Sequence, residues 1–109
     1  MADLIDRLSG QTTRPKLPVH QFVAGLRLYA AGLVTRQEIA AAWDLQGDEA
    51  TQATNLANQV DAQTTAANKA LYALRVDAVA LLLEIGADTI YHNADGTINK
   101  TKVATALGI

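Results

Sequence analysis

Residues 49–86 read EATQATNLANQVDAQTTAANKALYALRVDAVALLLEIG, and this stretch decides the fold of the chain. Its apolar residues recur in steps of three, four and seven, which is the periodicity of an α-helix. The apolar positions are Ala53, Leu56, Val60, Ala67, Leu71, Leu74, Ala78, Leu81 and Ile85. An unbroken helix over these residues would be ~57 Å long at ~1.5 Å per residue, which exceeds the width of a domain this small.

The apolar series is weakest over residues 61–68. Gln63 interrupts the stripe there, and Thr64-Thr65 can cap a new helix. We therefore expect two helices that pack antiparallel. The alternative is one long helix that projects into an oligomer.

Signals for helix starts also mark the chain upstream of this stretch. Pro18 suits the first turn of a helix, because the N–H that proline lacks has no helical partner at that position. Thr35 and Glu38 have the spacing of a capping box, which opens a short helix. Asp48 is expected to cap the helix that follows. These signals predict one helical domain over residues 19–109.

The first eighteen residues have the pattern of an arm. A short helix is expected near the start, with an apolar side formed by Leu4, Ile5 and Leu8. Residues 10–18 should be extended, because their two prolines push the preceding residues out of the helical region. We therefore expect residues 1–18 to form an N-terminal arm, a small amphipathic tip on a tether. A helix packed on its own domain is the alternative.

The C-terminal part contains a turn signal. Residues 89–92 and 97–99 flank Asp95-Gly96, which indicates a short β-hairpin or a tight loop. A final helix is expected to run through Leu107. The predicted fold class is all-α: a small bundle of four to five helices with an extended N-terminal arm and a short C-terminal β-hairpin.

Composition and charge exclude several classes of protein. The chain has no cysteine, which excludes disulfide frameworks, thiolate zinc sites and cysteine nucleophiles. No apolar run approaches the ~20 residues of a membrane span, and no secretion signal is visible. Residues 1–36 carry five basic and two acidic groups, residues 37–68 carry five acidic groups and no Lys or Arg, and residues 69–109 balance. This polarity suits docking to complementary neighbours.

The span 35–60 has the spacing of a helix-turn-helix unit. Its second helix offers Gln52, Asn55 and Gln59 as base readers, but it carries three acids and no cation over residues 48–61. A helix of this charge is repelled by phosphate. A plain helical hairpin is therefore the preferred interpretation, and a helix-turn-helix regulator or packaging adaptor is the alternative function.

No catalytic or metal-binding constellation is recognisable. An EF-hand alignment on Gly96 would place Tyr91 at the first ligand position and Lys102 at the last, where an acid and a bidentate glutamate are required. His20 and His92 lie far apart in the sequence and have no neighbouring ligand spacing. The sequence therefore predicts a non-enzymatic protein with no cofactor and no metal.

One resemblance covers residues 1–46. It rests on Leu4–Gly10, Leu17–Phe22, Leu28-Tyr29 and Gly32–Ile39. These segments resemble small virion-associated proteins encoded among the structural genes of tailed bacteriophages. The resemblance implies a particle component at the head–tail connection, the tail or the capsid surface, present in repeated copies.

The expected function is therefore that of a structural subunit of a tailed-phage virion. Its partners would be other virion proteins and copies of itself, without membrane and without nucleic acid. It would reside in the virion, and in the host cytoplasm during assembly. The expected contact residues are an apolar anchor, two basic groups and three acceptors: Leu4, Ile5 and Leu8; Arg14 and Lys16; Asp48, Glu49 and Asp61.

Overall fold

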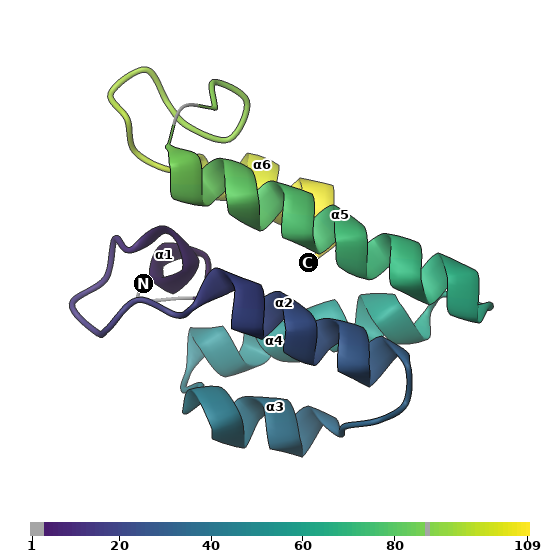
Figure 1. Cartoon of the computed structure of the whole chain (residues 1–109). Coiled ribbons are helices and arrows are strands. Elements are labelled where there is room, and N and C mark those ends of the chain that lie inside the picture. Colours follow the sequence, from purple (N-terminus) through teal and green to yellow (C-terminus); the bar gives the residue numbers. More distant parts are fainter. Residues whose placement is uncertain (1–3, 87) are drawn as a thin grey trace.

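The computed structural model describes residues 4–86 and 88–109 and is all-α. Within these residues it contains six helices and no strand (Figure 1). The helices are α1 Leu4–Ser9, α2 Val19–Ala30, α3 Arg36–Trp43, α4 Asp48–Asp61, α5 Ala66–Ile85 and α6 Lys100–Leu107. The all-α prediction is confirmed.

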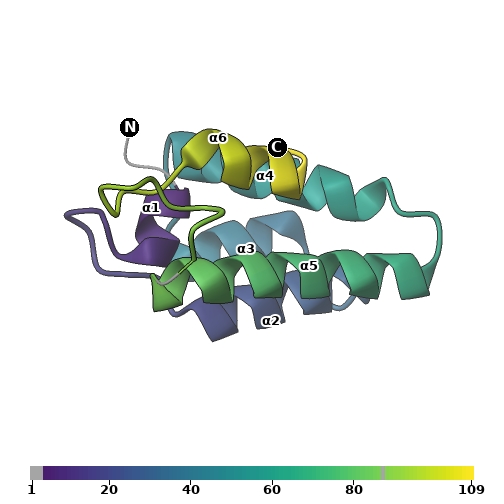
Figure 2. The same cartoon turned by 90° about the horizontal axis from the view of Figure 1, so that it is seen from above.

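The long apolar stretch forms two helices, as expected. It breaks after Asp61, and the side chain of Thr65 accepts a hydrogen bond from the backbone N–H of Asn68 at the start of α5. The chain reverses at this break, so α4 and α5 run antiparallel (Figure 2). A threonine cap satisfies a backbone donor that would otherwise have no partner, and this explains why the new helix starts here.

The other helix ends follow local rules. Thr35 and Glu38 form the predicted capping box of α3, with both reciprocal hydrogen bonds present. Gly86 ends α5 in the left-handed conformation, at a φ of 70°. The start of α4 differs from the prediction. Gly47 is the capping residue, and Asp48 is the first helical residue rather than the cap.

The core lies between an antiparallel pair, α2 and α5, and the helices that cover it. α2 and α5 lie side by side along most of their length, and α4 and α6 lie on the other side of the core (Figures 1 and 2). α3 packs against both α2 and α4. The largest fully buried side chains come from α1, α2, α4, α5, α6 and the segment before α2; they include Leu4, Ile5, Leu17, Phe22, Val23, Leu56, Val60, Val76 and Val103.

The expected N-terminal arm is not found. α1 wedges between α4 and α5 at one end of the bundle (Figure 1). Leu4, Ile5 and Leu8 are at most 3% exposed, so they belong to the core and do not form an external anchor. The physical reason is that a helix this short is not stable in water until its apolar side is buried, and the body of the same chain offers that surface.

The expected C-terminal β-hairpin is also not found. Between α5 and α6 the structure has one isolated bridge, between His92 and Ile98, in the described residues 88–99. The side chain of Asp88 accepts a hydrogen bond from the backbone N–H of Tyr91, which a longer ladder would use. The segment is therefore the tight loop that was the alternative, and it is fastened to the core through Ile98.

Candidate interaction surface

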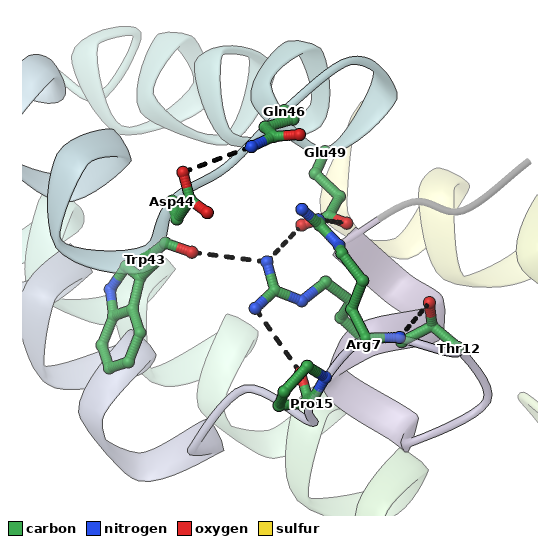
Figure 3. A network of polar contacts seen from close by, with 8 residues as sticks. Arg7, Thr12, Pro15, Trp43, Asp44, Gln46 and Glu49 are labelled. Carbon is green, nitrogen blue, oxygen red and sulfur yellow. Dashed lines mark hydrogen bonds and ion pairs between the residues drawn. The ribbon is translucent and has the colours of Figure 1, made fainter.

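The predicted contact residue Glu49 lies at the centre of a buried ion cluster. It is 0% exposed, and Arg7 Nη1 lies 2.6 Å from its Oε2 atom. The Arg14 guanidinium contacts the other carboxylate oxygen. Arg7 also donates to the carbonyl oxygens of Trp43 and Pro15 (Figure 3). The cluster therefore ties the N-terminal segment to the turn between α3 and α4.

The remaining charged candidates also have partners inside the molecule. Lys16 lies 3.7 Å from Glu84 on α5. Asp61 accepts hydrogen bonds from Tyr29 and Arg36. The Tyr29 hydroxyl, and after it the Arg36 guanidinium, lower the pKa of the Asp61 carboxyl below its usual value.

The uneven charge distribution seen in the sequence is used, at least in part, for contacts inside the molecule. The basic N-terminal part and the acidic middle of the chain meet within one molecule, through Arg14–Glu49 and Arg36–Asp61. Asp48 is exposed at the first residue of α4, as Asp61 is at the last, whereas Glu49 is fully buried. Of the predicted basic and acceptor residues, the structure brings Arg14 and Glu49 together, while Lys16 and Asp61 pair with Glu84 and Arg36 instead.

α3 and α4 have the spacing of a helix-turn-helix unit. The side chains that could read bases are not free on its surface. The side chain of Gln59 donates to the carbonyl oxygen of Gly108, 2.6 Å away. The amide oxygen of Gln52 is buried. Asn58 accepts a hydrogen bond from Arg36. All three residues proposed as base readers, Gln52, Asn55 and Gln59, are thus partly buried, and Gln59 is also hydrogen-bonded within the fold.

The described part of the chain has no group of three or more His, Cys, Asp or Glu side chains that could hold a metal ion. His92 Nδ1 lies 3.1 Å from the backbone carbonyl of Asp88. None of the described helices is both long and apolar enough to cross a membrane.

An exposed apolar surface lies on α5. Six apolar residues share one side of this helix and are exposed; we call them the outer stripe. They are Ala67, Leu71, Leu74, Ala78, Leu81 and Ile85. Leu71 is 62% exposed and Ile85 is 59% exposed. Soluble monomers seldom leave a row of large apolar side chains in water, and rows of this kind mark interaction sites.

The outer stripe is exposed because α5 is apolar on two sides. A second row, with Tyr72, Val76, Val79 and Leu83, faces the core and is buried. A helix that is apolar all round is normally buried all round. The second row alone packs α5 into the core of this domain, so the outer stripe is not needed for the core and stays exposed. In the sequence this stripe was visible as the regular apolar series of residues 67–85. That series indicates a helix, but it does not show which side of the helix is buried.

Two of the grooves that border α2 reach its neighbours α5 and α3. One, of about 390 Å³, lies along α2 and α5 and is lined by Arg27, Ala30, Ala31, Ala66, Ala70 and Leu74. Leu74 belongs to the outer stripe, so this groove widens the apolar surface toward α2. The other, of about 340 Å³, lies between α2 and α3, with Leu28 and Trp43 among its lining residues.

The borders of the outer stripe carry few charges. On the α2 side, Asp77 pairs with Arg27 at 2.8 Å and Glu84 pairs with Lys16. Arg75 is exposed on the helix. The surface thus has an apolar centre with a polar rim, the usual anatomy of a protein–protein interface.

No family model, no curated protein and no solved structure matches the chain.

Proposed function

We propose that this chain is a non-enzymatic structural subunit of a tailed-phage virion. It acts through contacts with other subunits at the head–tail connector, the tail or the capsid. The resemblance of residues 1–46 to small virion proteins supplies the class of particle. The observation that carries the contact role is the outer stripe of α5, which the fold of a single chain leaves uncovered.

The contact surface differs from the one expected from the sequence. Leu4, Ile5 and Leu8 are in the core, so contacts between subunits are assigned to α5 instead. The ion pairs Arg14–Glu49 and Lys16–Glu84 then serve to hold the N-terminal segment on the body of the protein. The apolar surface takes the role that the arm was expected to have.

The proposal is tested by mass spectrometry of density-purified particles from cells that produce the chain. We expect the chain in the particle fraction in repeated copies. Leu74→Glu should reduce its incorporation, because it puts a charge in the middle of the outer stripe. Leu33→Glu is the matched control, since Leu33 is 71% exposed but lies outside α5.

Two results would contradict the proposal. One is a chain found only outside particles. The other is a salt-dependent mobility shift of duplex DNA by the purified protein, which would favour the helix-turn-helix regulator or packaging adaptor.

A further inference from the structure

The loop between α5 and α6 contains a pair of residues that is chemically labile. Asp95 is followed by Gly96, and no other Asp or Asn in the sequence precedes a glycine. Because glycine has no Cβ, its backbone nitrogen can approach a neighbouring carboxyl carbon more closely than that of any other residue. An Asp–Gly pair is therefore where the backbone most readily cyclises onto an aspartate side chain.

The reaction runs in two steps through a cyclic imide. The backbone nitrogen of Gly96 forms a bond to Cγ of Asp95 while the C–O bond of the carboxyl group breaks, and the N–H proton and the hydroxyl leave as water. Water then adds to the backbone carbonyl carbon of Asp95 and breaks its bond to nitrogen. The product is an isoaspartyl residue, in which the main chain runs through the former side chain and is longer by one methylene. Ring closure needs the protonated carboxyl group, because oxygen leaves poorly from a carboxylate.

Thr97 holds this carboxyl group in its ionised form. The hydroxyl and the backbone N–H of Thr97 donate to Oδ1 of Asp95, at 2.6 Å and 3.0 Å. These bonds, the one from the hydroxyl first, lower the pKa of the Asp95 carboxyl below its usual value. Asp95 is exposed, so hydrogen bonding rather than burial controls its protonation. The carboxyl group is thus kept in the form that closes the ring most slowly.

The attacking nitrogen is engaged as well. The backbone N–H of Gly96 donates to the carbonyl oxygen of Asn93, 3.0 Å away, and this bond must break before the nitrogen can attack. Asn93 also fixes the turn from its other side. Its backbone N–H donates to the carbonyl oxygen of Thr97 at 2.7 Å, and its side-chain amide donates to the Thr97 hydroxyl at 3.0 Å. Both reacting groups therefore have partners in the folded turn.

The turn leads directly to residues that fasten the loop and start α6. Ile98 is 6% exposed, and the side chain of Asn99 accepts a hydrogen bond from the backbone N–H of Lys102. An additional methylene at position 95 lengthens the chain just before these two residues. The modified chain should therefore hold the loop less firmly on the core.

We propose that Asp95–Gly96 is a latent site of isoaspartate formation, which the folded turn keeps unreactive and which reacts when the turn opens. In this proposal Thr97 is a positioning residue that protects the bond through its hydroxyl. The inference concerns a chemical modification and is independent of the proposed virion function.

The rate of isoaspartate formation tests the protection by the fold. The full chain is incubated at neutral pH, folded or in guanidinium chloride, and its isoaspartate is labelled with an isoaspartyl methyltransferase and located by peptide mapping. The folded chain should react at least about tenfold more slowly, the rate equivalent of one hydrogen bond to a charged group. Asp95→Ser gives the background, because serine has no carboxyl carbon. Equal rates at position 95 in the folded and the unfolded chain would overturn the proposal.

Variants of Thr97 test the role of the hydroxyl. Thr97→Val removes the hydroxyl at nearly the same shape, so it should speed the reaction of the folded chain by about tenfold and raise the pKa of Asp95 in an NMR titration. Thr97→Ser keeps the hydroxyl and should react as slowly as the natural chain. Thr101→Val, at an exposed threonine in α6, is the matched control. In guanidinium chloride all these chains should react equally.

A folded Thr97→Val chain that reacts no faster than the natural chain would also overturn the proposal. Circular dichroism shows whether each variant keeps its helices. The comparison of the folded with the unfolded natural chain requires no substitution, so it decides the proposal even where a variant does not fold.

Discussion

At the scale of single residues, the buried carboxylate of Glu49 is expected to have a large effect on stability. A charge with no exposure is tolerated only when it is paired. Arg7 and Arg14 supply the pairs, and both come from the N-terminal segment. The cluster therefore makes the position of that segment depend on one side chain of α4.

Replacing Glu49 by glutamine tests this dependence. The variant Glu49→Gln keeps the shape but leaves the buried Arg7 guanidinium without a counter-charge. We expect the free energy of unfolding to fall by about 3–5 kcal/mol in urea denaturation. Asp48→Asn, at the exposed neighbouring position, should cost less than about 1 kcal/mol. Equal losses in the two variants would show that the ion cluster does not hold the fold. The double variant Arg7→Met/Glu49→Leu should recover most of the loss.

Tyr72 predicts a pH dependence on the alkaline side. Its hydroxyl donates to the carbonyl oxygen of Leu107, and burial raises the pKa of Tyr72 from 10.0 to about 12. The folded state thus keeps the proton longer than the unfolded state. The stabilisation is complete below the unfolded pKa and is lost as the pH rises through the folded pKa.

The variant Tyr72→Phe checks this effect. It removes the hydrogen bond at neutral pH, at a cost of about 1 kcal/mol, and it should flatten the fall of Tm between about pH 10 and pH 12. Thermal melts followed by circular dichroism measure both changes. A Tm that falls as steeply in the variant as in the natural chain would assign the alkaline transition to another group.

At the scale of elements, the break between α4 and α5 is determined by residues close to it in the sequence. Residues 62–65 lie between two helices, and the side chain of Thr65 satisfies the backbone N–H of Asn68 in the first turn of α5. Without this break the helix would continue and carry the outer stripe away from the body of the domain.

Removing the cap should destabilise α5 measurably. Thr65→Ala is expected to lower the free energy of unfolding by about 1 kcal/mol, the usual worth of a threonine cap. Thr64→Ala is the matched control, because Thr64 is exposed, adjacent and not the capping residue. Chemical denaturation of the two variants gives the comparison. A control that loses as much as Thr65→Ala would remove the special role of the cap.

At the scale of the whole molecule, the N-terminal segment is part of one core. α1 contributes Leu4, Ile5 and Leu8 to the space between α4 and α5. A domain of this size has a total stability of only about 5–15 kcal/mol. Loss of these three side chains therefore removes a large share of it.

A pair of leucine variants tests the whole-molecule role of α1. Leu8→Ala should lower the free energy of unfolding by about 2–5 kcal/mol, because it opens a cavity in the core. Leu33→Ala, at a leucine that is 71% exposed, should change it by no more than about 0.5 kcal/mol. A variant at Leu8 as stable as the natural chain would restore the arm as an independent segment.

The sequence alone determined the helices and most of their ends. The capping box at Thr35, the break before Thr65 and the stop at Gly86 depend on neighbours a few residues away, and such contacts are visible as spacing. The same holds for the all-α class, because helical periodicity is a property of a short window.

Only the tertiary structure decided which apolar surfaces are covered. Both sides of α5 have helical spacing, and the choice of the row with Val76 over the row with Leu74 depends on what α1, α2, α4 and α6 bring against it. Arg7 and Glu49 are 42 residues apart, so no local pattern announces their pairing. Burial is a sum over distant parts of the chain. For this reason the core position of α1 and the exposed stripe of α5 emerge only when the helices are packed together.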